Sequence, residues 1–487
     1  MDWSLDVINA YCKEHFPNDV ACELVEGKGR IMIAQRDVQQ GDVLFVEPPL
    51  HIVAEDPHND AFVAVRQLCM CNPDDFDYEP LWYWTALCSL TKEQVKAGPR
   101  MGSLPTVSLE QQRRLLCLYH EPVDRVSVAV TRIVKVLGLK VAPLAVEELL
   151  QAWILNCFEH SDDPPGYSAY FASSFANHSC SPNAIWAEGD DGAHVVRARE
   201  PVAKGDEVTI SYLEEQVLLQ SADARKKVLR DTKLFECTCP RCAAKTADEG
   251  ESIGVDMCRG YICKACGECQ VFHPLKRMGK GKGKGKTKGT ALVGVSCAAC
   301  GAAADCNESE RLLSAETQLQ AKLDKLDEQV AERGYKVMEQ DRVQSLLKLV
   351  ANGKAGPVGP QHWLADRLWE HLQEWYDQEG RREDARQMLR LRAAYQRRAY
   401  PGLSAALAWT LEKQADVFMR HLGFGAKMLD SDAPLEEELV EEVGPIFEES
   451  MRILGLMFGK DHEHFVQVER KHRMALAFFQ KRAQVCR

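Results

Sequence analysis

The chain has 487 residues, of which 45% are hydrophobic and 27% charged, a composition typical of a globular protein with about three domains. Its formal net charge of -12 argues against a nucleic-acid-binding protein as a whole, because neutralising phosphates requires a basic face. The first residues carry acids where a signal peptide would carry bases, and no apolar run reaches the length of a membrane span. We therefore expect a protein that is neither exported nor inserted in a membrane.

Short strands are predicted in two parts of the chain. Between residues 20 and 55, a glycine turn at 27–30 leads into an alternating apolar segment, and the apolar run 43–46 ends at two prolines that cannot continue a strand ladder. Short alternating runs separated by turn residues return between 166 and 212.

Helices are predicted elsewhere. Apolar residues recur at helical spacing through 58–160, for example at Leu81, Trp84 and Cys88, and a helix is expected over 214–231. From residue 309 onward the pattern is helical throughout, in segments of about 15–20 residues separated by glycine and proline. Such a succession suggests stacked hairpins of the tetratricopeptide type, although the period of about 34 residues typical of that repeat is not evident.

The cysteines are clustered. Ten of the 19 fall between Cys237 and Cys306, and in a chain without a signal peptide such clusters indicate metal more often than disulfides. The run Cys237-x-Cys239-x-x-Cys242 supplies three thiolates at ligand spacing, one fewer than the four that a tetrahedral zinc site requires.

A second metal site follows from spacing alone. Two matching turns, each Cys-x-x-Cys-Gly, begin at Cys263 and Cys297 and supply Cys266 and Cys300 as the remaining ligands of a zinc ribbon. Cys266-x-x-Cys269 is an alternative register that lacks the following glycine, and free buried cysteines are the other alternative. Four further residues in this stretch have no assigned role, namely Cys258, Cys269, Cys306 and His273.

Between the two turns lies a low-complexity run of alternating lysine and glycine, Lys280–Lys286. Such a run cannot bury side chains, so we expect a flexible, solvated loop. Contact with nucleic acid or a nuclear import signal are the alternatives, and this loop is the one exception to the argument against nucleic acid.

Three short motifs occur in a fixed order. They are Asn177-His178-Ser179-Cys180-Ser181-Pro182-Asn183, then Ile210-Ser211-Tyr212, then Phe235-Glu236-Cys237-Thr238-Cys239-Pro240-Arg241-Cys242. The first two have plain interpretations when taken singly, an Asx turn with a buried histidine and a packed strand tyrosine. The upstream segment 27–30 has one as well, an ordinary hairpin turn. Together they resemble the catalytic core of the SET family of protein-lysine methyltransferases.

The resemblance implies S-adenosylmethionine as cofactor and assigns roles to residues. Tyr212 would be catalytic, with its hydroxyl near the transferred methyl group. Cys180 would be the fourth zinc ligand beside the three downstream cysteines, which gives two zinc ions in all. The expected cofactor-binding residues are Lys28, Gly29, Arg30, Asn177, His178, Tyr212 and Phe235, with Phe235 stacked on the adenine.

The resemblance also places two residues in the channel that admits the substrate lysine. Tyr170 falls where the family has an aromatic wall. Lys233 stands two residues before Phe235, where relatives often carry a second aromatic residue. This departure bears on substrate choice and on the number of methyl groups added.

Beyond the core, the helical insertion, the Cys-x-Cys-x-x-Cys ending and the helical C-terminal region resemble the SMYD branch, the SET and MYND domain methyltransferases. The MYND zinc finger itself is missing, since residues 50–165 contain five cysteines without paired spacing. We predict an α+β protein: a SET-type fold of short strands with a helical insertion, small zinc-binding modules and an all-α, TPR-like C-terminal domain. The expected domains are 1–57 (N-terminal SET), 58–165 (insertion), 166–232 (core SET), 233–246 (post-SET zinc module), 255–308 (zinc ribbon) and 309–487 (C-terminal helices).

The function expected from the resemblance is S-adenosylmethionine-dependent methylation of a lysine on a histone or a non-histone protein. The alternative is an adaptor that keeps a SET scaffold but binds protein partners through its C-terminal helices, a hypothesis motivated by Lys233 and the missing finger. We expect a monomer located in the cytoplasm, the nucleus or both.

Overall fold

The computed structural model of the protein describes residues 3–96, 103–243, 254–275, 292–350, 356–421 and 437–485. The run Lys280–Lys286 lies outside the described residues. The chain divides into two compact units. The first unit comprises Met1–His178 and Pro182–Ile210, and the second comprises Ser179–Ser181 and Ser211–Arg487.

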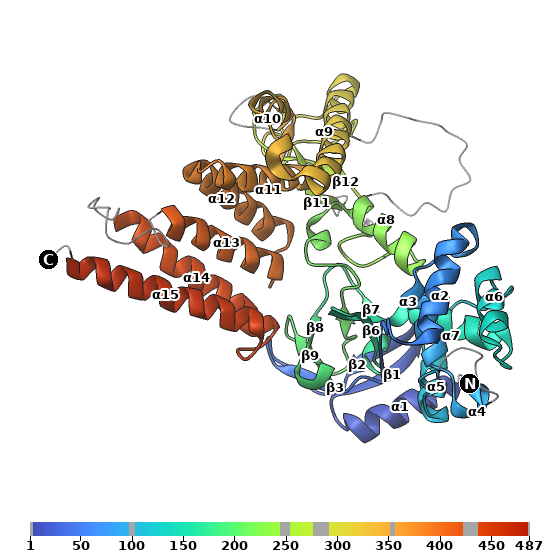
Figure 1. Ribbon diagram of the computed structural model, residues 1–487. Coiled ribbons are helices and arrows are strands. Elements are labelled where there is room, and N and C mark those ends of the chain that lie inside the picture. The colour runs from blue at the N-terminus through green and yellow to red at the C-terminus, as the bar shows by residue number, and fades with distance from the viewer. Residues whose placement is uncertain are drawn as a thin grey trace. The chain divides into compact units, whose positions relative to one another are not determined.

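The first unit contains small sheets of short strands, as the alternating segments predicted (Figure 1). An antiparallel pair β1–β2, a sheet in the order β3-β9-β8, a sheet in the order β4-β6-β5 and a parallel pair β7–β10 make up the set. The bounds are β1 Val20–Val25, β2 Gly29–Ala34, β3 Val43–Glu47, β4 His51–Ala54, β5 Phe158–Asp162, β6 Pro165–Ala169, β7 Asn177–His178, β8 Ala184–Glu188, β9 His194–Ala198 and β10 Thr209–Ile210.

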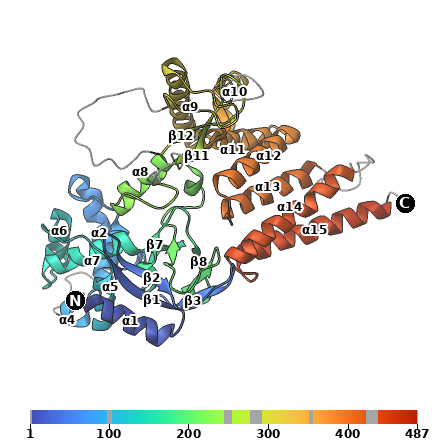
Figure 2. The ribbon, with the colours of Figure 1, turned by 180° about the vertical axis from the view of Figure 1, so that it is seen from behind.

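Helices fill the predicted insertion and gather into one group of the first unit (Figure 2). Trp153 is buried among them, and its indole N–H donates to the Ser89 hydroxyl at 2.8 Å, so its one polar atom is satisfied. The bounds are α1 Trp3–His15, α2 Asp60–Cys71, α3 Pro80–Cys88, α4 Lys92–Val95, α5 Leu109–Cys117, α6 Val128–Leu137 and α7 Pro143–Asn156.

The second unit begins with a helix that is shorter than predicted. The helix expected over 214–231 starts only at Ser221, whose hydroxyl accepts from the Ala224 N–H at 3.2 Å and caps α8, Ala222–Lys233. Residues 217–219 form a separate 3-10 turn. α8 ends at Leu234, which has a φ of 60°.

The remaining strands of the second unit form one sheet in the order β12-β11-β13. β11 is Val255–Tyr261, β12 is Val271–Pro274 and β13 is Val358–His362. β13 lies within the region predicted as helical, where Pro357, Gly359 and Pro360 are incompatible with a helix interior.

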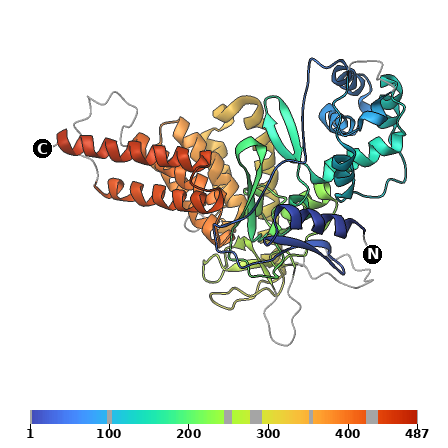
Figure 3. The ribbon, with the colours of Figure 1, turned by 90° about the horizontal axis from the view of Figure 1, so that it is seen from below.

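From Cys306 onward, helices make up most of the described part of the second unit, in agreement with the predicted helical C-terminal region. Consecutive helices from α11 to α15 pack against one another, and α14 and α15 lie side by side (Figure 3). The bounds are α9 Cys306–Arg333, α10 Gln340–Leu347, α11 Trp363–Gln378, α12 Arg382–Ala399, α13 Ala405–His421, α14 Glu437–Met457 and α15 Glu463–Val485. No helix in the described part of the chain is long and apolar enough to cross a membrane.

A buried polar network connects four elements of the second unit. Glu316 of α9 accepts from the Arg259 guanidinium at 2.8 Å and from the Tyr261 hydroxyl at 2.7 Å, both on β11. His362 of β13 lies 3.3 Å from the other Glu316 oxygen, and Arg259 also pairs with Asp223 of α8 at 3.1 Å. Because Glu316 is only 8% exposed, its charge depends on these partners rather than on water.

Candidate functional site

The predicted site residues fall in both units. Lys28, Gly29, Arg30, Tyr170, Asn177 and His178 belong to the first unit, and Tyr212, Lys233, Phe235 and the eight cysteines belong to the second. Each group is therefore described within its own unit.

Residues 27–30 form the hairpin turn between β1 and β2, the plain interpretation of this segment. Gly27 and Gly29 both have φ of 78°, and an added Cβ at either position would have nothing within 4 Å, so glycine is required here by the backbone conformation rather than by space. The Lys28 ammonium pairs with Glu207 at 2.5 Å, and Arg30 donates to the Cys117 carbonyl at 2.7 Å. Whether this turn also contacts a cofactor stays a prediction.

Asn177 and His178 form the short strand β7, which pairs in parallel with β10 so that His178 lies opposite Ile210. The Asn177 amide donates to Glu207 at 3.2 Å and to the Arg30 carbonyl at 3.4 Å. The motif is thereby fixed against both β10 and the 27–30 turn, through side-chain as well as backbone bonds.

Asn183 and Glu207, to which the sequence analysis assigned no role, position this segment. The Asn183 amide donates to the Glu207 carbonyl at 2.8 Å and accepts from the Thr209 N–H at 2.8 Å, which fixes the start of β10. Glu207 binds both Lys28 and Asn177, so one carboxylate connects two of the predicted cofactor segments. Its place immediately before a strand was the only signal in the sequence.

Glu47 of β3 is a third such residue. Its fully buried carboxylate accepts from the N–H groups of Ala172 and Ser173 at 2.7 and 2.8 Å and from the Ser173 hydroxyl. Burial raises the pKa of Glu47, and these bonds oppose that shift. The carboxylate thereby orders the chain just before Asn177.

Tyr170, the predicted channel wall, packs inside the first unit. It is 1% exposed, its ring stacks on that of His194 at 3.8 Å, and its hydroxyl donates to the Gly192 carbonyl at 2.5 Å. Burial raises the pKa of Tyr170 to about 12, so it remains a neutral hydrogen-bond donor. Its role in a substrate channel stays a prediction.

Tyr212, Lys233 and Phe235 come together in the second unit, although up to 23 positions separate them in the chain. The ring of Phe235 meets that of Tyr212 edge to face at 6.3 Å between centroids, and the Lys233 ammonium lies 6.0 Å from the centre of the Tyr212 ring. The Ser211 hydroxyl accepts from the Leu213 N–H at 3.0 Å and fixes the turn that carries Tyr212. All three side chains are partly buried, as a residue that contacts a ligand would be.

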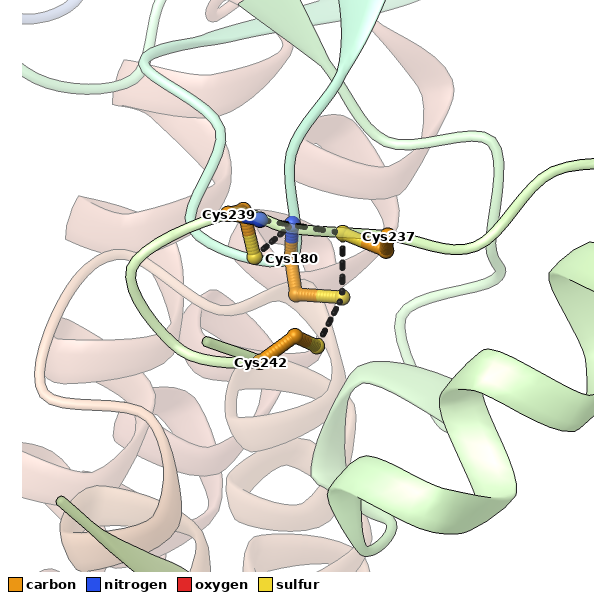
Figure 4. Close-up of side chains that lie close together, drawn as sticks. All are labelled: Cys180, Cys237, Cys239 and Cys242. Carbon is orange, nitrogen blue, oxygen red and sulfur yellow. Dashed lines mark hydrogen bonds between the residues drawn. The ribbon is translucent and has the colours of Figure 1, made fainter. Parts of the chain in front are cut away.

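The first cysteine quartet is assembled as the resemblance implied (Figure 4). The thiols of Cys180, Cys237, Cys239 and Cys242 lie within 4.8 Å of one another, and the Cys180 sulfur is 3.5 Å from that of Cys242. Hydrogen bonds with Cys180 and Cys237 lower the pKa of Cys242 to about 7 and lower that of Cys239 further. Hydrogen bonds with Cys237, Cys239 and Cys242 raise the pKa of Cys180, and the pKa of Cys237 is raised as well. Four thiols that converge on one point fit a tetrahedral zinc ion.

The second quartet, Cys263, Cys266, Cys297 and Cys300, is likewise brought within 4.8 Å. Each turn is closed by a glycine N–H that donates to the carbonyl of the first cysteine, Gly267 to Cys263 and Gly301 to Cys297, both at 2.9 Å. Both glycines have positive φ, 78° and 74°, which explains the glycine after each Cys-x-x-Cys pair.

This geometry selects one of the two registers considered for the second quartet. Cys269 is 7% exposed and lies against Gly359, outside the cluster, so the alternative register is not the one adopted. Burial would raise the pKa of Cys263, but the N–H groups of Cys266 and Ala265 lower it to about 7. These residues also fit a zinc ion.

Comparison with known protein families finds a match for part of the chain. The profile of the SET domain family matches residues 29–213, which is less than half of the chain but includes Gly29, Arg30, Asn177, His178 and Tyr212. Residues 29–213 form a SET domain.

Single proteins are similar to this chain over stretches of about 100 residues. The chain is 39% identical over 102 residues to the histone-lysine N-methyltransferase ASHR1 of Arabidopsis thaliana, which covers 20% of each chain. It is 41% identical over 97 residues to the protein-lysine N-trimethyltransferase SMYD5 of Homo sapiens, covering 20% of this chain and 21% of SMYD5. The aligned part of the chain thus spans about a fifth of the length of these relatives.

Among solved structures, the SET domain of LSMT bound to lysine and AdoHcy was aligned with this chain. The alignment covers 90% of this chain and 98% of the LSMT chain. The identity of 13% and the TM-score of 0.28 are too low to show a common overall fold.

Proposed function

We propose that the protein is an S-adenosylmethionine-dependent protein-lysine N-methyltransferase. The observation that carries the proposal is the SET domain, together with the cluster of Tyr212, Phe235 and Lys233 at its end. Relatives named as lysine methyltransferases, among them ASHR1 and SMYD5, support the reaction class.

In this proposal S-adenosylmethionine supplies an electrophilic methyl group. Lys28–Arg30, Asn177, His178 and Phe235 would hold the cofactor. Asn177 is fixed by Glu207, so the donor groups of this segment would need little rearrangement. Phe235 presents an aromatic face of the kind that stacks on adenine.

The task of Tyr212 follows from the chemistry of the reaction. Displacement at a methyl group proceeds in line, so the rate depends chiefly on how the attacking amine is oriented. The Tyr212 hydroxyl would orient the amine of the substrate lysine. That amine must also be neutral, and a partly buried setting beside a cation such as Lys233 lowers the pKa of an incoming ammonium.

Both cysteine quartets would hold zinc. The first would fix the segment that carries Phe235, since Cys237 is only two residues away. The second would stabilise the small ribbon between β11 and α9, whose buried core is limited to a few residues around Tyr261 and Leu312. The substrate would be a histone or another protein, and the protein would act as a monomer in the cytoplasm or nucleus.

A direct test uses labelled S-adenosylmethionine with a whole-cell protein extract, followed by mass spectrometry of the modified lysines. Tyr212→Phe removes only the hydroxyl and should lower the rate by about 100-fold, since misorientation on the order of 1 Å costs that much. Tyr119→Phe is the matched control, because Tyr119 is 55% exposed and bonded to Glu121 in the other unit. Full activity of Tyr212→Phe would refute the role of Tyr212.

Calorimetry with S-adenosylhomocysteine separates this proposal from the adaptor alternative. An enzyme with the proposed site binds this product, whereas a scaffold that has lost the reaction shows no measurable heat of binding. Absence of binding, in protein that carries both zinc ions and is folded by circular dichroism, would favour the adaptor.

A further inference from the structure

The first cysteine quartet raises a problem of charge. A zinc ion held by four thiolates carries a net charge of -2, and here Cys180, Cys237 and Cys242 are at most 2% exposed. Cys239 is only partly exposed, so water can solvate little of this charge. An uncompensated buried charge is strongly destabilising, so the surrounding residues must supply cations.

Arg225 supplies the first cation. It lies on α8 and is 1% exposed, with Nη2 3.7 Å from the Cys242 sulfur and 3.3 Å from the Arg241 carbonyl oxygen. Its Nη1 donates to the Gln220 carbonyl and lies 3.9 Å from the sulfur of Cys258. An arginine guanidinium is not deprotonated in proteins, so Arg225 places a positive charge beside the quartet.

Arg241 supplies the second cation from inside the ligand loop itself. Its Nη1 donates to the Cys180 carbonyl at 2.5 Å, and its Nη2 lies 3.7 Å from the Cys258 sulfur. Nη2 also donates to the Ala399 carbonyl at 3.0 Å, and the guanidinium lies over the ring of Tyr400 at 5.0 Å. The planar fork of arginine makes these simultaneous bonds, which lysine cannot reproduce.

One carboxylate lies close to these cations and has its own compensation. Asp256 accepts from the Ala222 N–H at 2.7 Å, at the start of α8, and from the Cys258 N–H at 3.1 Å. The positive end of the helix dipole thus faces Asp256. Burial raises the pKa of Cys258, which keeps that fifth thiol neutral. The guanidinium groups of Arg225 and Arg241 thus lie where they can offset the charge of -2 on a zinc tetrathiolate.

The second quartet of the same chain is stabilised differently. Cys266 and Cys300 are exposed, so water can solvate their charge, and backbone N–H groups of Ala265 and Cys266 stabilise the Cys263 thiolate. Each quartet consists of four cysteines, but the two differ in their surroundings. The second quartet therefore serves as an internal reference for the effect of nearby cations on the first.

We propose that Arg225 and Arg241 are the counter-cations of a zinc tetrathiolate at Cys180, Cys237, Cys239 and Cys242, and that they set how firmly this site retains its metal. The inference rests on the proposed zinc site. Arg225 and Arg241 are positioning residues, since both act through the thiolates and their backbone. Their loss should weaken zinc binding at this site alone.

The test measures zinc release from the full-length protein to a coloured chelator. Two phases are expected for the wild type, one per quartet, and a Cys263→Ser/Cys266→Ser variant identifies the phase of the second quartet. Arg225→Gln keeps a donor for the Gln220 carbonyl but removes the charge, and should weaken zinc binding at the first quartet about 10- to 100-fold. The phase of the second quartet should not change.

Two further variants make the result specific. Arg225→Lys retains the charge and should restore most of the lost affinity, whereas a merely structural role would leave it as weak as Arg225→Gln. Lys227 lies on the same helix, and its side chain is 74% exposed. Lys227→Met removes this charge and should change neither phase. The visible spectrum of the cobalt-substituted protein should show a tetrathiolate in every variant that retains metal.

The outcomes are distinct. If the wild type binds one zinc, and the Cys263→Ser/Cys266→Ser variant binds none, the proposed zinc at the first quartet is wrong. If the wild type binds two and Arg225→Gln releases both at wild-type rates, the counter-cation inference is wrong while the zinc site stands. Equal loss in Arg225→Gln and Arg225→Lys would also overturn it, because charge would then not be the property that matters.

Discussion

Glu316→Gln is expected to be among the most destabilising single substitutions in the second unit. The carboxylate accepts from Arg259 and Tyr261 and faces His362, and none of the four residues is more than 9% exposed. An amide has one acceptor oxygen and turns its NH2 group toward one of these donors, so Arg259 is left buried with its charge only partly compensated. Breaking such a buried pair costs about 3–5 kcal/mol in the free energy of unfolding.

Urea unfolding followed by circular dichroism measures this loss. Glu310→Gln is the matched control, since Glu310 lies on the exposed face of the same helix, and it should change the free energy of unfolding by less than about 0.5 kcal/mol. The double variant with Arg259→Met should lose less than the sum of the two single losses, because both members of the ion pair are then gone. A loss below about 1 kcal/mol for Glu316→Gln would refute the reasoning.

The same network predicts a dependence on pH. Burial by itself would raise the pKa of Glu316, but His362 and Arg259 outweigh it and hold the pKa well below its ordinary value. The folded protein therefore favours the carboxylate, so its contribution is fully present above the unfolded pKa of about 4.3 and is lost as the pH falls below it. The difference in stability between wild type and Glu316→Gln should shrink below about pH 4, and a constant difference would contradict this account.

Three other predictions concern separate parts of the chain. Under the proposed function, Lys233→Phe replaces a cation beside Tyr212 by a ring that attracts methylated ammonium, and should shift the products toward higher methylation by about 2- to 30-fold, as mass spectrometry would show. Ser108→Ala removes the acceptor of the Gln111 N–H at the start of α5 and should cost about 1 kcal/mol in thermal or urea unfolding. Cys297→Ser should abolish one of the two bound zinc ions and make residues 255–308 sensitive to proteolysis, and an unchanged digestion pattern would count against a structural metal there.

The sequence predicted correctly those turns and helices that are determined by residues close together in the chain. The paired Cys-x-x-Cys-Gly turns need only their own few residues to form, and Gly267 and Gly301 adopt the positive φ that the spacing indicates. The 27–30 hairpin and the C-terminal helices followed likewise from glycine placement and apolar spacing. In each case the physical cause lies within a few residues of the pattern.

The remaining features depend on partners that are distant in the chain. The Glu47 carboxylate is satisfied by N–H groups 125 and 126 residues later, and nothing around Glu47 itself indicates this. Arg225 resembles any other basic residue of an amphipathic helix until Cys242 and Cys258 are placed beside it. The helix expected over 214–231 begins only at Ala222, because the Ser221 hydroxyl caps it there and residues 217–219 form a 3-10 turn instead.

The chain order of the first quartet has a consequence for synthesis. All four cysteines and Arg225 are made by residue 242, whereas one of the carbonyls that accept from Arg241, that of Ala399, comes 157 residues later (399 minus 242). At a synthesis rate of roughly 5–20 residues per second, the four cysteines would precede Ala399 by about 8–30 s. Zinc captured during this interval would protect them from oxidation and give the later helices a preformed surface on which to fold.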